Sequence, residues 1–316
     1  MTIILETLLL ALGFVLLVKG ADFFVDGASS IAAKLKVPSL IIGLTVVSMG
    51  TSLPEAAVSI SAGLSGNNDI SLGNVIGSNI FNLLVVVGVS SMILPILTDT
   101  AILKRDMPIN LGITAVLCLM LLDGELSRLD AAILLVLFAA YMFILIRSAL
   151  KNRVQETQQE PMTWTKSLIF TVLGVAAIII GGKIVVNSAT EIATALGMSE
   201  TLIGLTVVAI GTSLPELVTS IVAAKKGDSG IAMGNVIGSN IFNVLFILGL
   251  SGVIQPLHAD SAFFIDTGIL IGVSLVTYLF IFTKRKTSRI EGASMTVMYV
   301  IYTAYIIMRS FHIWIF

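Results

Sequence analysis

Long apolar stretches separated by short polar connections run along the whole chain. A helix needs about 20 apolar residues to cross the hydrocarbon core of a bilayer. Because a backbone exposed to lipid must satisfy its hydrogen bonds within its own segment, each stretch is predicted to be a helix. The pattern predicts an all-α integral membrane protein with ten transmembrane helices, centred near residues 15, 50, 80, 113, 139, 180, 213, 243, 272 and 302.

Composition agrees with a membrane protein. Of the 316 residues, 56% are hydrophobic and 12% are charged, whereas a soluble domain carries about 25% charged residues. The net charge of −1 gives no reason to expect nucleic acid as a partner. Residues 1–14 lack a basic segment ahead of the apolar run, so we interpret them as part of the first span and not as a cleaved signal.

Lysine and arginine predict the orientation, because cytoplasmic connections carry an excess of both. One set of alternate connections holds fourteen of the eighteen basic residues: Lys34, Lys36, Lys104, Arg105, Arg147, Lys151, Arg153, Lys166, Lys225, Lys226, Lys284, Arg285, Lys286 and Arg289. The other set holds only Arg128 and Arg309. We therefore expect a multi-pass protein of the cell (inner or plasma) membrane, with both termini outside and a cytoplasmic linker at 151–163.

The two halves of the chain, 1–150 and 164–316, repeat each other. One constant shift along the chain takes GLTVVSMGTSLPE (43–55) onto GLTVVAIGTSLPE (204–216) with two differences. The same shift takes GNVIGSNIFN (73–82) onto an identical segment at 234–243. Each half holds five spans, and because five is odd the second half enters from the opposite side. The predicted fold is two inverted five-helix repeats, an arrangement typical of secondary transporters.

The repeated hexapeptide GTSLPE, at 50–55 and 211–216, carries a proline that should open its helix. Pro54 and Pro215 lack an N–H and crowd the carbonyl four residues earlier. Carbonyls freed in this way are tolerated at membrane depth only next to protein, water or an ion. A lone proline is often only a kink, so its interpretation depends on the side chains that accompany it.

Each hexapeptide also places two hydroxyls and a carboxylate on one helical face. Thr51 and Ser52 lie four and three residues before Glu55, and the second copy repeats this spacing. A lone serine or threonine usually bonds back to its own helix. An ionised carboxylate at the bilayer centre costs at least about 2.5–3.5 kcal/mol, which favours a functional role for Glu55 and Glu216.

The second motif, GNVIGSNIFN, adds a serine and an asparagine four residues apart on one face in each half. Its glycine pairs, beginning at Gly73 and Gly234, are explained by close helix packing. Its serines and last asparagines could be interhelical hydrogen-bonding groups, but beside two glutamates they are favoured as ion ligands. The other asparagines are interpreted as caps or interhelical bonding groups: Asn74, Asn79, Asn235 and Asn240.

The two motifs together offer two carboxylates, two amide oxygens, six hydroxyls and loosened carbonyls. Calcium takes about six to eight oxygen ligands, and this set suits it far better than zinc or copper. Two negative charges can neutralise one divalent ion or hold two or three monovalent ions. The sequence therefore suggests that different cations compete for one site.

The paired GTSLPE and GNVIGSNIFN segments resemble the cation/calcium exchanger superfamily, and in particular prokaryotic members of the sodium/calcium exchanger type. Its two family repeats correspond to 43–82 and 204–243. The resemblance implies an antiporter, not an enzyme, that exchanges Ca²⁺ for Na⁺ by alternating access as spans one and six slide across a rigid core. It implies no cofactor, with Ca²⁺, Na⁺ and the lipid bilayer as the partners and a monomer as the default expectation.

The resemblance also implies four oxygen-lined cation sites between the second, third, seventh and eighth spans. The implied side-chain ligands are Thr51, Ser52, Glu55, Ser78, Asn82, Thr212, Ser213, Glu216, Ser239 and Asn243, with the backbone carbonyls of Ser48 and Ala209.

Four alternatives to sodium/calcium exchange are weighed at this point. Some relatives, including potassium-dependent exchangers, carry aspartate where this chain has Asn82 or Asn243, which weakens a case for potassium coupling. Proton-coupled exchangers typically read GN-x-x-E, which GTSLPE does not match, so a Ca²⁺/H⁺ antiporter is the runner-up. A passive cation channel is disfavoured by the inverted repeat, and an intramembrane hydrolase by the lack of a nearby histidine.

Several charged residues fall inside spans one and six, away from the repeated motifs. These are Lys19, Asp22, Asp26, Lys183 and Glu191. Lys19 and Asp22 have the spacing of an ion pair within one helix. We interpret all five as structural or gating residues and not as direct ligands.

Overall fold

Helices form nearly all of the chain in the computed structural model, which describes residues 2–66, 68–152, 161–198 and 209–310. The first half contains, in order, α1 (Thr2–Leu35), α2 (Ser39–Ile42), η1 (Gly43–Val47), α3 (Ser48–Thr51), α4 (Leu53–Leu64), α5 (Asn68–Phe81), η2 (Asn82–Val86), α6 (Val87–Ile93), β1 (Ile96–Leu97), η3 (Ile102–Asp106), α7 (Met107–Met120), η4 (Leu121–Asp123), β2 (Glu125–Leu126) and α8 (Arg128–Lys151). The second half contains α9 (Trp164–Ala195), α11 (Ala209–Thr212), α12 (Leu214–Lys225), α13 (Ser229–Phe242), η6 (Asn243–Leu248), α14 (Gly249–Ile254), β3 (Leu257–His258), α15 (Ser261–Lys284), β4 (Lys286–Thr287) and α16 (Arg289–Ser310).

The helices are those of a membrane protein. Eight described helices are long and apolar enough to cross a bilayer, and a ninth span results if the bent pair Ser39–Thr51 and Leu53–Leu64 is counted as one. The span expected near residue 213 contains α11 and α12, but its first part, 199–208, lies outside the described residues. The structure therefore confirms a predominantly helical membrane protein.

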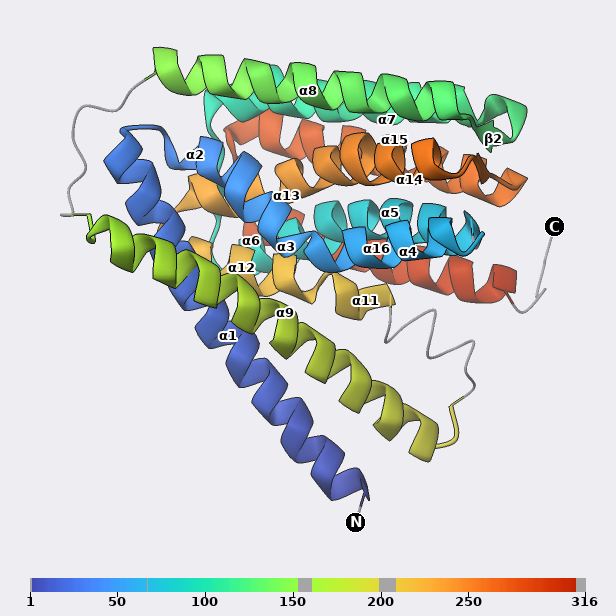
Figure 1. Cartoon of the computed structure of the whole chain (residues 1–316), viewed down its shortest axis with the longest axis horizontal. Helices are drawn as coiled ribbons and strands as arrows, with labels where there is room; N and C mark the ends of the chain where they lie inside the picture. Colours follow the sequence, from blue (N-terminus) through green and yellow to red (C-terminus); the bar gives the residue numbers. More distant parts are fainter. Residues whose placement is uncertain (1, 67, 153–160, 199–208, 311–316) are drawn as a thin grey trace.

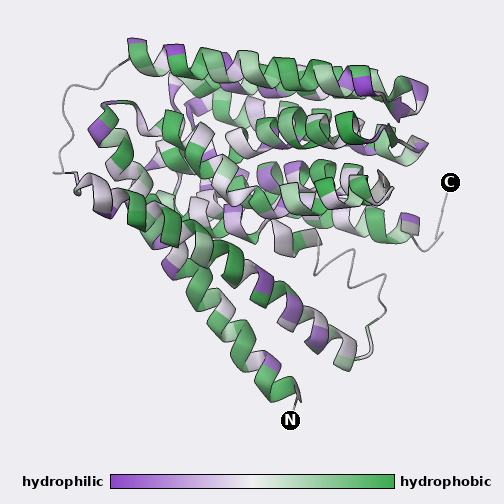
Figure 2. Cartoon of the chain, in the orientation of Figure 1, coloured by the Kyte–Doolittle hydropathy of each residue, from purple (hydrophilic) through white to green (hydrophobic). Residues whose placement is uncertain are grey.

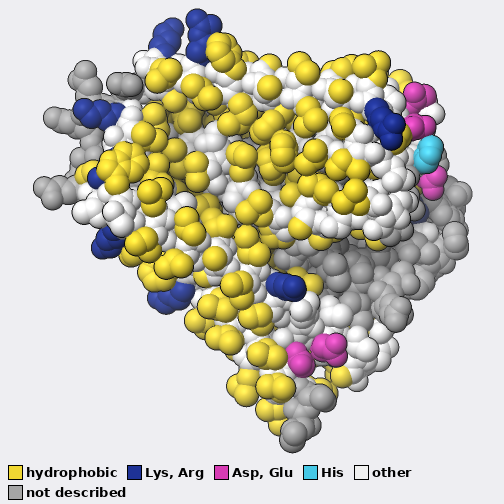
Figure 3. Space-filling model, viewed as in Figure 1, with side chains coloured by type: hydrophobic (Ala, Val, Ile, Leu, Met, Phe, Trp, Pro, Cys, Tyr) yellow, Lys and Arg dark blue, Asp and Glu magenta, His cyan; other side chains and the backbone are white. Residues whose placement is uncertain are grey.

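Apolar side chains cover the outside of the helices. Figure 2 shows hydrophobic residues along the outer helices, and Figure 3 shows an almost continuous apolar face over α8 and α1. Val136 is 68% exposed and Ile4 is 70% exposed, which would be costly in water but is expected against lipid. In the same view lysine and arginine gather mostly along the left edge, where α1 and α8 end and α9 begins.

The helices α1 and α9 form a long diagonal pair that projects away from the remaining bundle (Figure 1). Glycines let their backbones approach closely: a Cβ added to Gly20 would lie 3.0 Å from the carbonyl oxygen of Gly174. A Cβ added to Gly174 would lie 2.8 Å from the carbonyl oxygen of Gly20. Small residues at such a contact are typical of helices that pack within a membrane.

Two short antiparallel ribbons join the halves. In one, Ile96 of β1 pairs with Thr287 of β4. In the other, Leu126 of β2 pairs with Leu257 of β3. The constant shift that relates the repeated motifs converts the first pairing into the second, so the register is the same in both ribbons. The helical segment from η3 to η4 runs from β1 to β2, which places the two ribbons at opposite ends of the bundle.

Glycine packing in the second motif is confirmed only in the second half. A Cβ added to Gly234 would lie 3.0 Å from Cα of Gly43, so α13 packs tightly on η1. A Cβ on Gly77 would meet no atom of the described residues within 4 Å. The counterpart of η1 in the second half, 204–208, is outside the described residues, so the matching contact stays a prediction.

Candidate cation site

The proline of each hexapeptide breaks its helix directly before the glutamate. The helix α3 ends at Thr51, and α4 begins at Leu53 with Pro54 in its first turn. The two segments are bent by 51°, which confirms the predicted opening. In the second half α11 ends at Thr212 and α12 begins at Leu214. Each glutamate therefore sits in the first turn of a new helix, where the positive end of the helix dipole favours a carboxylate.

Each hexapeptide's serine bonds to the glutamate of the other hexapeptide. The Ser52 hydroxyl donates to Glu216 Oε1 at 2.8 Å, and the Ser213 hydroxyl donates to Glu55 Oε1 at 3.1 Å. Both carboxylates are at most 1% exposed, and they lie close enough for their charges to interact. The structure thus brings both hexapeptides together in one buried cluster, although they belong to different halves of the sequence.

The helices α5 and α13 complete the cluster with serines and asparagines. The Ser78 hydroxyl lies 3.1 Å from the Ser213 hydroxyl, and Ser239 lies near Glu216 and 3.4 Å from the Ser48 carbonyl oxygen. Asn82 and Asn243 are fully buried, each at the start of a π-helical turn, η2 or η6. Single π-helical turns are frequent at functional sites.

Buried acceptor oxygens in this cluster lack hydrogen-bond donors among the described residues. They are Glu55 Oε2, Glu216 Oε2, Asn82 Oδ1 and Asn243 Oδ1. An acceptor left unpaired in a protein interior costs about 1–3 kcal/mol, and more when it is charged. Four such oxygens, symmetrically distributed over the two halves, are what a dehydrated cation would satisfy.

The two threonines behave differently. The Thr51 hydroxyl donates to Asn235 Oδ1 at 2.9 Å, whereas the Thr212 hydroxyl has no partner among the described residues. The backbone nearby differs too: the Ser52 amide donates to the Ser48 carbonyl, and the Ser213 amide donates to the Ile210 carbonyl. Ala209, whose carbonyl is the counterpart of that of Ser48, is the first residue of α11.

The remaining asparagines of the motif bond between helices, as expected. Asn74 Nδ2 donates to the Glu55 carbonyl at 3.1 Å and to the Ser59 hydroxyl at 2.8 Å. Asn235 Nδ2 donates to the Glu216 carbonyl at 3.2 Å and to the Ser220 hydroxyl at 2.9 Å. The sequence reasoning missed the two serines, although the same residue type at equivalent positions of both halves was a usable signal.

Lys19 and Asp22 have the spacing of an ion pair, but the structure pairs Asp22 with a residue of another helix. Asp22 faces Lys226 at the end of α12 instead, with Nζ and Oδ1 3.5 Å apart. The same Nζ lies 2.6 Å from Asp26 Oδ1. Asp22 of α1 therefore has its partner on another helix, and the spacing of residues within α1 could not reveal it. Neither Asp22 nor Asp26 bonds to the buried cluster within the described residues, and their structural or gating role stays a prediction.

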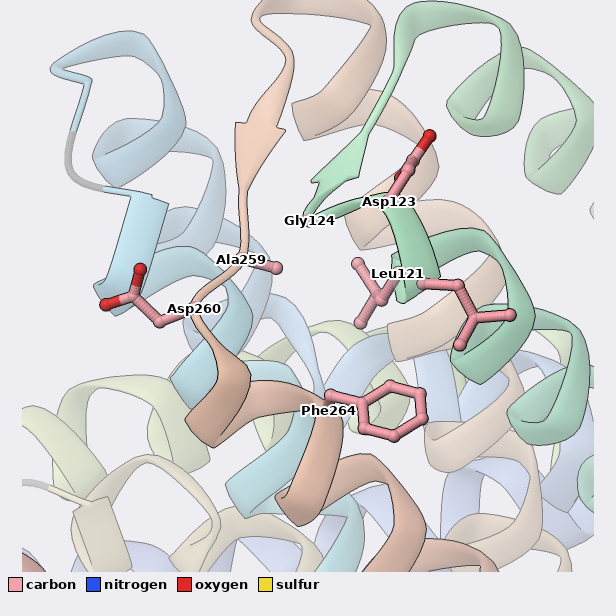
Figure 4. A pocket seen from close by; sticks show the side chains of 7 residues that line it. Leu121, Asp123, Gly124, Ala259, Asp260 and Phe264 are labelled. Atoms are coloured by element: carbon pink, nitrogen blue, oxygen red, sulfur yellow. The ribbon is translucent and has the colours of Figure 1, made fainter.

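A separate surface pocket of about 400 Å³ lies at the end of the bundle that holds β2 and β3 (Figure 4). Leu121, Phe264 and Ala259 line it together with the rim residues Asp123 and Asp260. Figure 4 shows that the two carboxylates point away from each other. They are therefore not placed to share one cation, and the pocket is distinct from the buried cluster.

Comparison with known proteins identifies the family. The sequence model described as "Sodium/calcium exchanger protein" matches residues 5–147 and, again, residues 166–308. The chain belongs to the sodium/calcium exchanger family. It is thus a membrane transporter and not an enzyme, as the sequence predicted. The starts of the two matched segments are related by the same offset that relates the repeated motifs.

Similar proteins cover almost the whole chain. The sodium/calcium exchanger MaX1 of Methanosarcina acetivorans is 38% identical over 336 residues, covering 93% of this chain and 96% of that protein. The inner membrane protein YrbG of Escherichia coli K12 is 38% identical over 284 residues, covering 86% and 87%. Among solved structures, the sodium-calcium exchanger NCX_Mj, soaked with 2.5 mM Na⁺ and 10 mM Sr²⁺, matches with a TM-score of 0.84 and 35% identity, covering 96% of this chain and 99% of that one.

Proposed function

We propose that this member of the family is a secondary active antiporter that exchanges Ca²⁺ for Na⁺. The observation that carries the proposal is a set of four acceptor oxygens, on Glu55, Glu216, Asn82 and Asn243, that find no donor within the described part of the chain. Two carboxylates balance the charge of one Ca²⁺, and the surrounding hydroxyls and amides supply neutral oxygen ligands. The resemblance to MaX1 and NCX_Mj, whose names state sodium/calcium exchange, supports the same substrates.

The proposed ligands are those implied by the sequence, divided equally between the halves. They are Thr51, Ser52, Glu55, Ser78, Asn82, Thr212, Ser213, Glu216, Ser239 and Asn243, with the carbonyls of Ser48 and Ala209. Their supply of hydroxyl, amide and carboxylate oxygens also suits Na⁺. Because two charges can be matched by one Ca²⁺ or by several Na⁺, binding of one cation should displace the other, which is the requirement for exchange.

We also propose the ten-helix plan with two inverted halves, 1–150 and 164–316, joined by a cytoplasmic linker at 151–163. Reciprocal contacts support it, since Ser52 bonds to Glu216 as Ser213 bonds to Glu55. The shared register of the two ribbons at opposite ends of the bundle supports it as well. Basic residues concentrated on one set of connections favour a cytoplasmic linker and external termini.

Alternating access is proposed to occur by movement of α1 and α9 as one body across the core. Their close mutual packing through Gly20 and Gly174 favours joint movement. Where α1 meets α12, Lys226 and Asp26 form a partly exposed ion pair, which would have to break if α1 moved relative to α12. Such movement would expose the buried cluster to one side of the membrane at a time.

A Ca²⁺/H⁺ antiporter remains the second candidate, because two buried carboxylates can carry protons as well as metal ions. Transport in proteoliposomes separates the two. Uptake of ⁴⁵Ca²⁺ should be driven by an outward-directed Na⁺ gradient and should not be driven by an outward-directed K⁺ or H⁺ gradient. Uptake driven by H⁺ alone would replace sodium with protons in the proposal, and uptake without any counter-ion would indicate a channel.

A further inference from the structure

Four buried asparagines form a closed hydrogen-bonded group between α5–η2 and α13–η6. Asn240 Nδ2 donates to the Asn79 carbonyl at 3.2 Å, and Asn82 Nδ2 donates to Asn240 Oδ1 at 3.1 Å. The other half mirrors this: Asn79 Nδ2 donates to the Asn240 carbonyl at 3.1 Å, and Asn243 Nδ2 donates to Asn79 Oδ1 at 3.0 Å. All four side chains are at most 1% exposed.

The direction of each chain of hydrogen bonds is fixed by a backbone carbonyl. A carbonyl oxygen can only accept, so Asn240 must turn its NH₂ group toward the carbonyl of Asn79. Its Oδ1 then points the other way and can only accept, so Asn82 must turn its own NH₂ group toward it. The Oδ1 of Asn82 is thereby directed away from Asn240, and it is one of the unpaired oxygens of the cluster.

The same logic applies to the reciprocal chain, which starts at the Asn240 carbonyl and ends at Asn243 Oδ1. This assignment does not depend on distinguishing oxygen from nitrogen in any single amide, because the starting carbonyl determines every later group. A carboxamide with its oxygen and nitrogen exchanged would present its NH₂ group to the cluster. That end of the dipole would repel a cation instead of binding it.

We propose that Asn79 and Asn240 are positioning residues that hold the amide oxygens of Asn243 and Asn82, respectively, toward the transported cation. Each half thus orients the amide ligand of the other half. Neither positioning residue contributes an unpaired oxygen of its own, because both Oδ1 atoms already accept a hydrogen bond. The inference rests on the proposed function, since it assigns Asn82 and Asn243 as cation ligands.

The test is a double-mutant cycle on the purified full-length protein, with Ca²⁺ binding measured by calorimetry and the KM and maximal rate of ⁴⁵Ca²⁺ exchange measured in proteoliposomes. Asn240→Leu removes the acceptor that orients Asn82. Replacing a group that orients a metal ligand typically costs about 10–100-fold in affinity. The Kd and the KM of the Asn240→Leu variant for Ca²⁺ should therefore rise by about tenfold or more. Asn110→Leu, which replaces another buried amide on α7, is the matched control and should leave both values unchanged.

The cycle separates orientation from general stability. In an Asn82→Ala background, Asn240→Leu should add less than about a twofold effect, because the ligand it orients is already gone. In an Asn243→Ala background it should retain its full effect. A role limited to helix packing would instead give the same loss in all backgrounds, and that result would overturn the proposal.

Asn79→Leu tests the proposal a second time, in the other half. Its effect should nearly vanish in an Asn243→Ala background and should be retained in full in an Asn82→Ala background. Asn240→Ala and Asn79→Ala provide smaller changes for the case in which a leucine variant does not fold. Unchanged Ca²⁺ affinity in folded variants of both residues would refute the positioning role alone. Failure of the unmutated protein to bind or exchange Ca²⁺ would refute the proposed function instead.

Discussion

The hydroxyl of Ser52 donates a 2.8 Å hydrogen bond to the carboxylate of Glu216, a residue 164 positions later in the chain. The reciprocal bond, from Ser213 to Glu55, is 3.1 Å long. Each carboxylate thus has one oxygen held by the opposite half and one oxygen with no donor among the residues that the structure describes.

Replacing either glutamate with glutamine should nearly abolish calcium exchange. Glu55→Gln or Glu216→Gln removes one of two charges that match a divalent ion, while the amide keeps the size of the side chain and can still accept from the serine. The measurement is Na⁺-driven ⁴⁵Ca²⁺ uptake, with protein folding checked by size-exclusion chromatography. Glu6→Gln, a change in α1 outside the cluster, is the control, and near-normal uptake by either cluster variant would refute the site.

Exchange should respond to membrane potential. If three Na⁺ exchange for one Ca²⁺, as the family resemblance implies, each cycle moves one net charge, which is worth about 2.3 kcal/mol per 100 mV. The rate of calcium uptake driven by an outward-directed Na⁺ gradient should therefore change when the membrane potential is set to different values with valinomycin and K⁺. A rate independent of potential would instead support two Na⁺ or two H⁺ for each Ca²⁺.

Cysteine labelling should place the connections on opposite sides of the membrane. With Cys118, the only cysteine, replaced by alanine, a cysteine introduced at Asn152 should react with an impermeant maleimide only from the cytoplasmic side. One introduced at Ser65, at the end of α4, should react only from outside. The reverse pattern would contradict the orientation taken from the basic residues.

Breaking the contact between α12 and α1 should shift the balance between the two access states. Lys226 contacts Asp22 and Asp26, but the positions of these three residues correspond to Ser65, Lys183 and Asn187 in the other half. Those residues cannot form an equivalent ion pair. Under the proposed alternating access, the contact should therefore favour one of the two states. An exposed ion pair contributes about 0.2–1 kcal/mol, which corresponds to at most about a fivefold shift.

Because the contact joins α1 to the end of α12, the state it favours should be the one closed on the side of the membrane where Lys226 lies. Lys226→Ala should therefore lower the KM for Ca²⁺ on that side and raise it on the opposite side. Lys225→Ala is the control, because Lys225 forms no ion pair within the part of the chain that the structure describes. Asp26→Asn, which removes the charge of the nearer carboxylate, should shift both values in the same direction as Lys226→Ala. Equal effects of the two lysine variants would mean that surface charge, and not the contact with α1, is responsible.

Local features of the site were predictable from the sequence. Pro54 opens its helix for a reason contained in the residue itself, since it lacks an N–H. The predicted membrane helices follow from apolar length, and the confirmed family follows from motifs written twice in the chain. Glu55 and Glu216 stand out because burial of a charge in hydrocarbon is costly wherever the rest of the chain lies.

Contacts between the halves were decided only by the tertiary structure. The sequence indicated that Ser52 shares a helical face with Glu55, but the structure bonds it to Glu216. It likewise allowed Asp22 to pair with Lys19, whereas Lys226 is its partner. A side chain near several acceptors of similar strength gains similar energy from each, so helix periodicity alone cannot choose among them. Packing makes that choice, because it determines which groups from distant parts of the chain come within hydrogen-bonding distance.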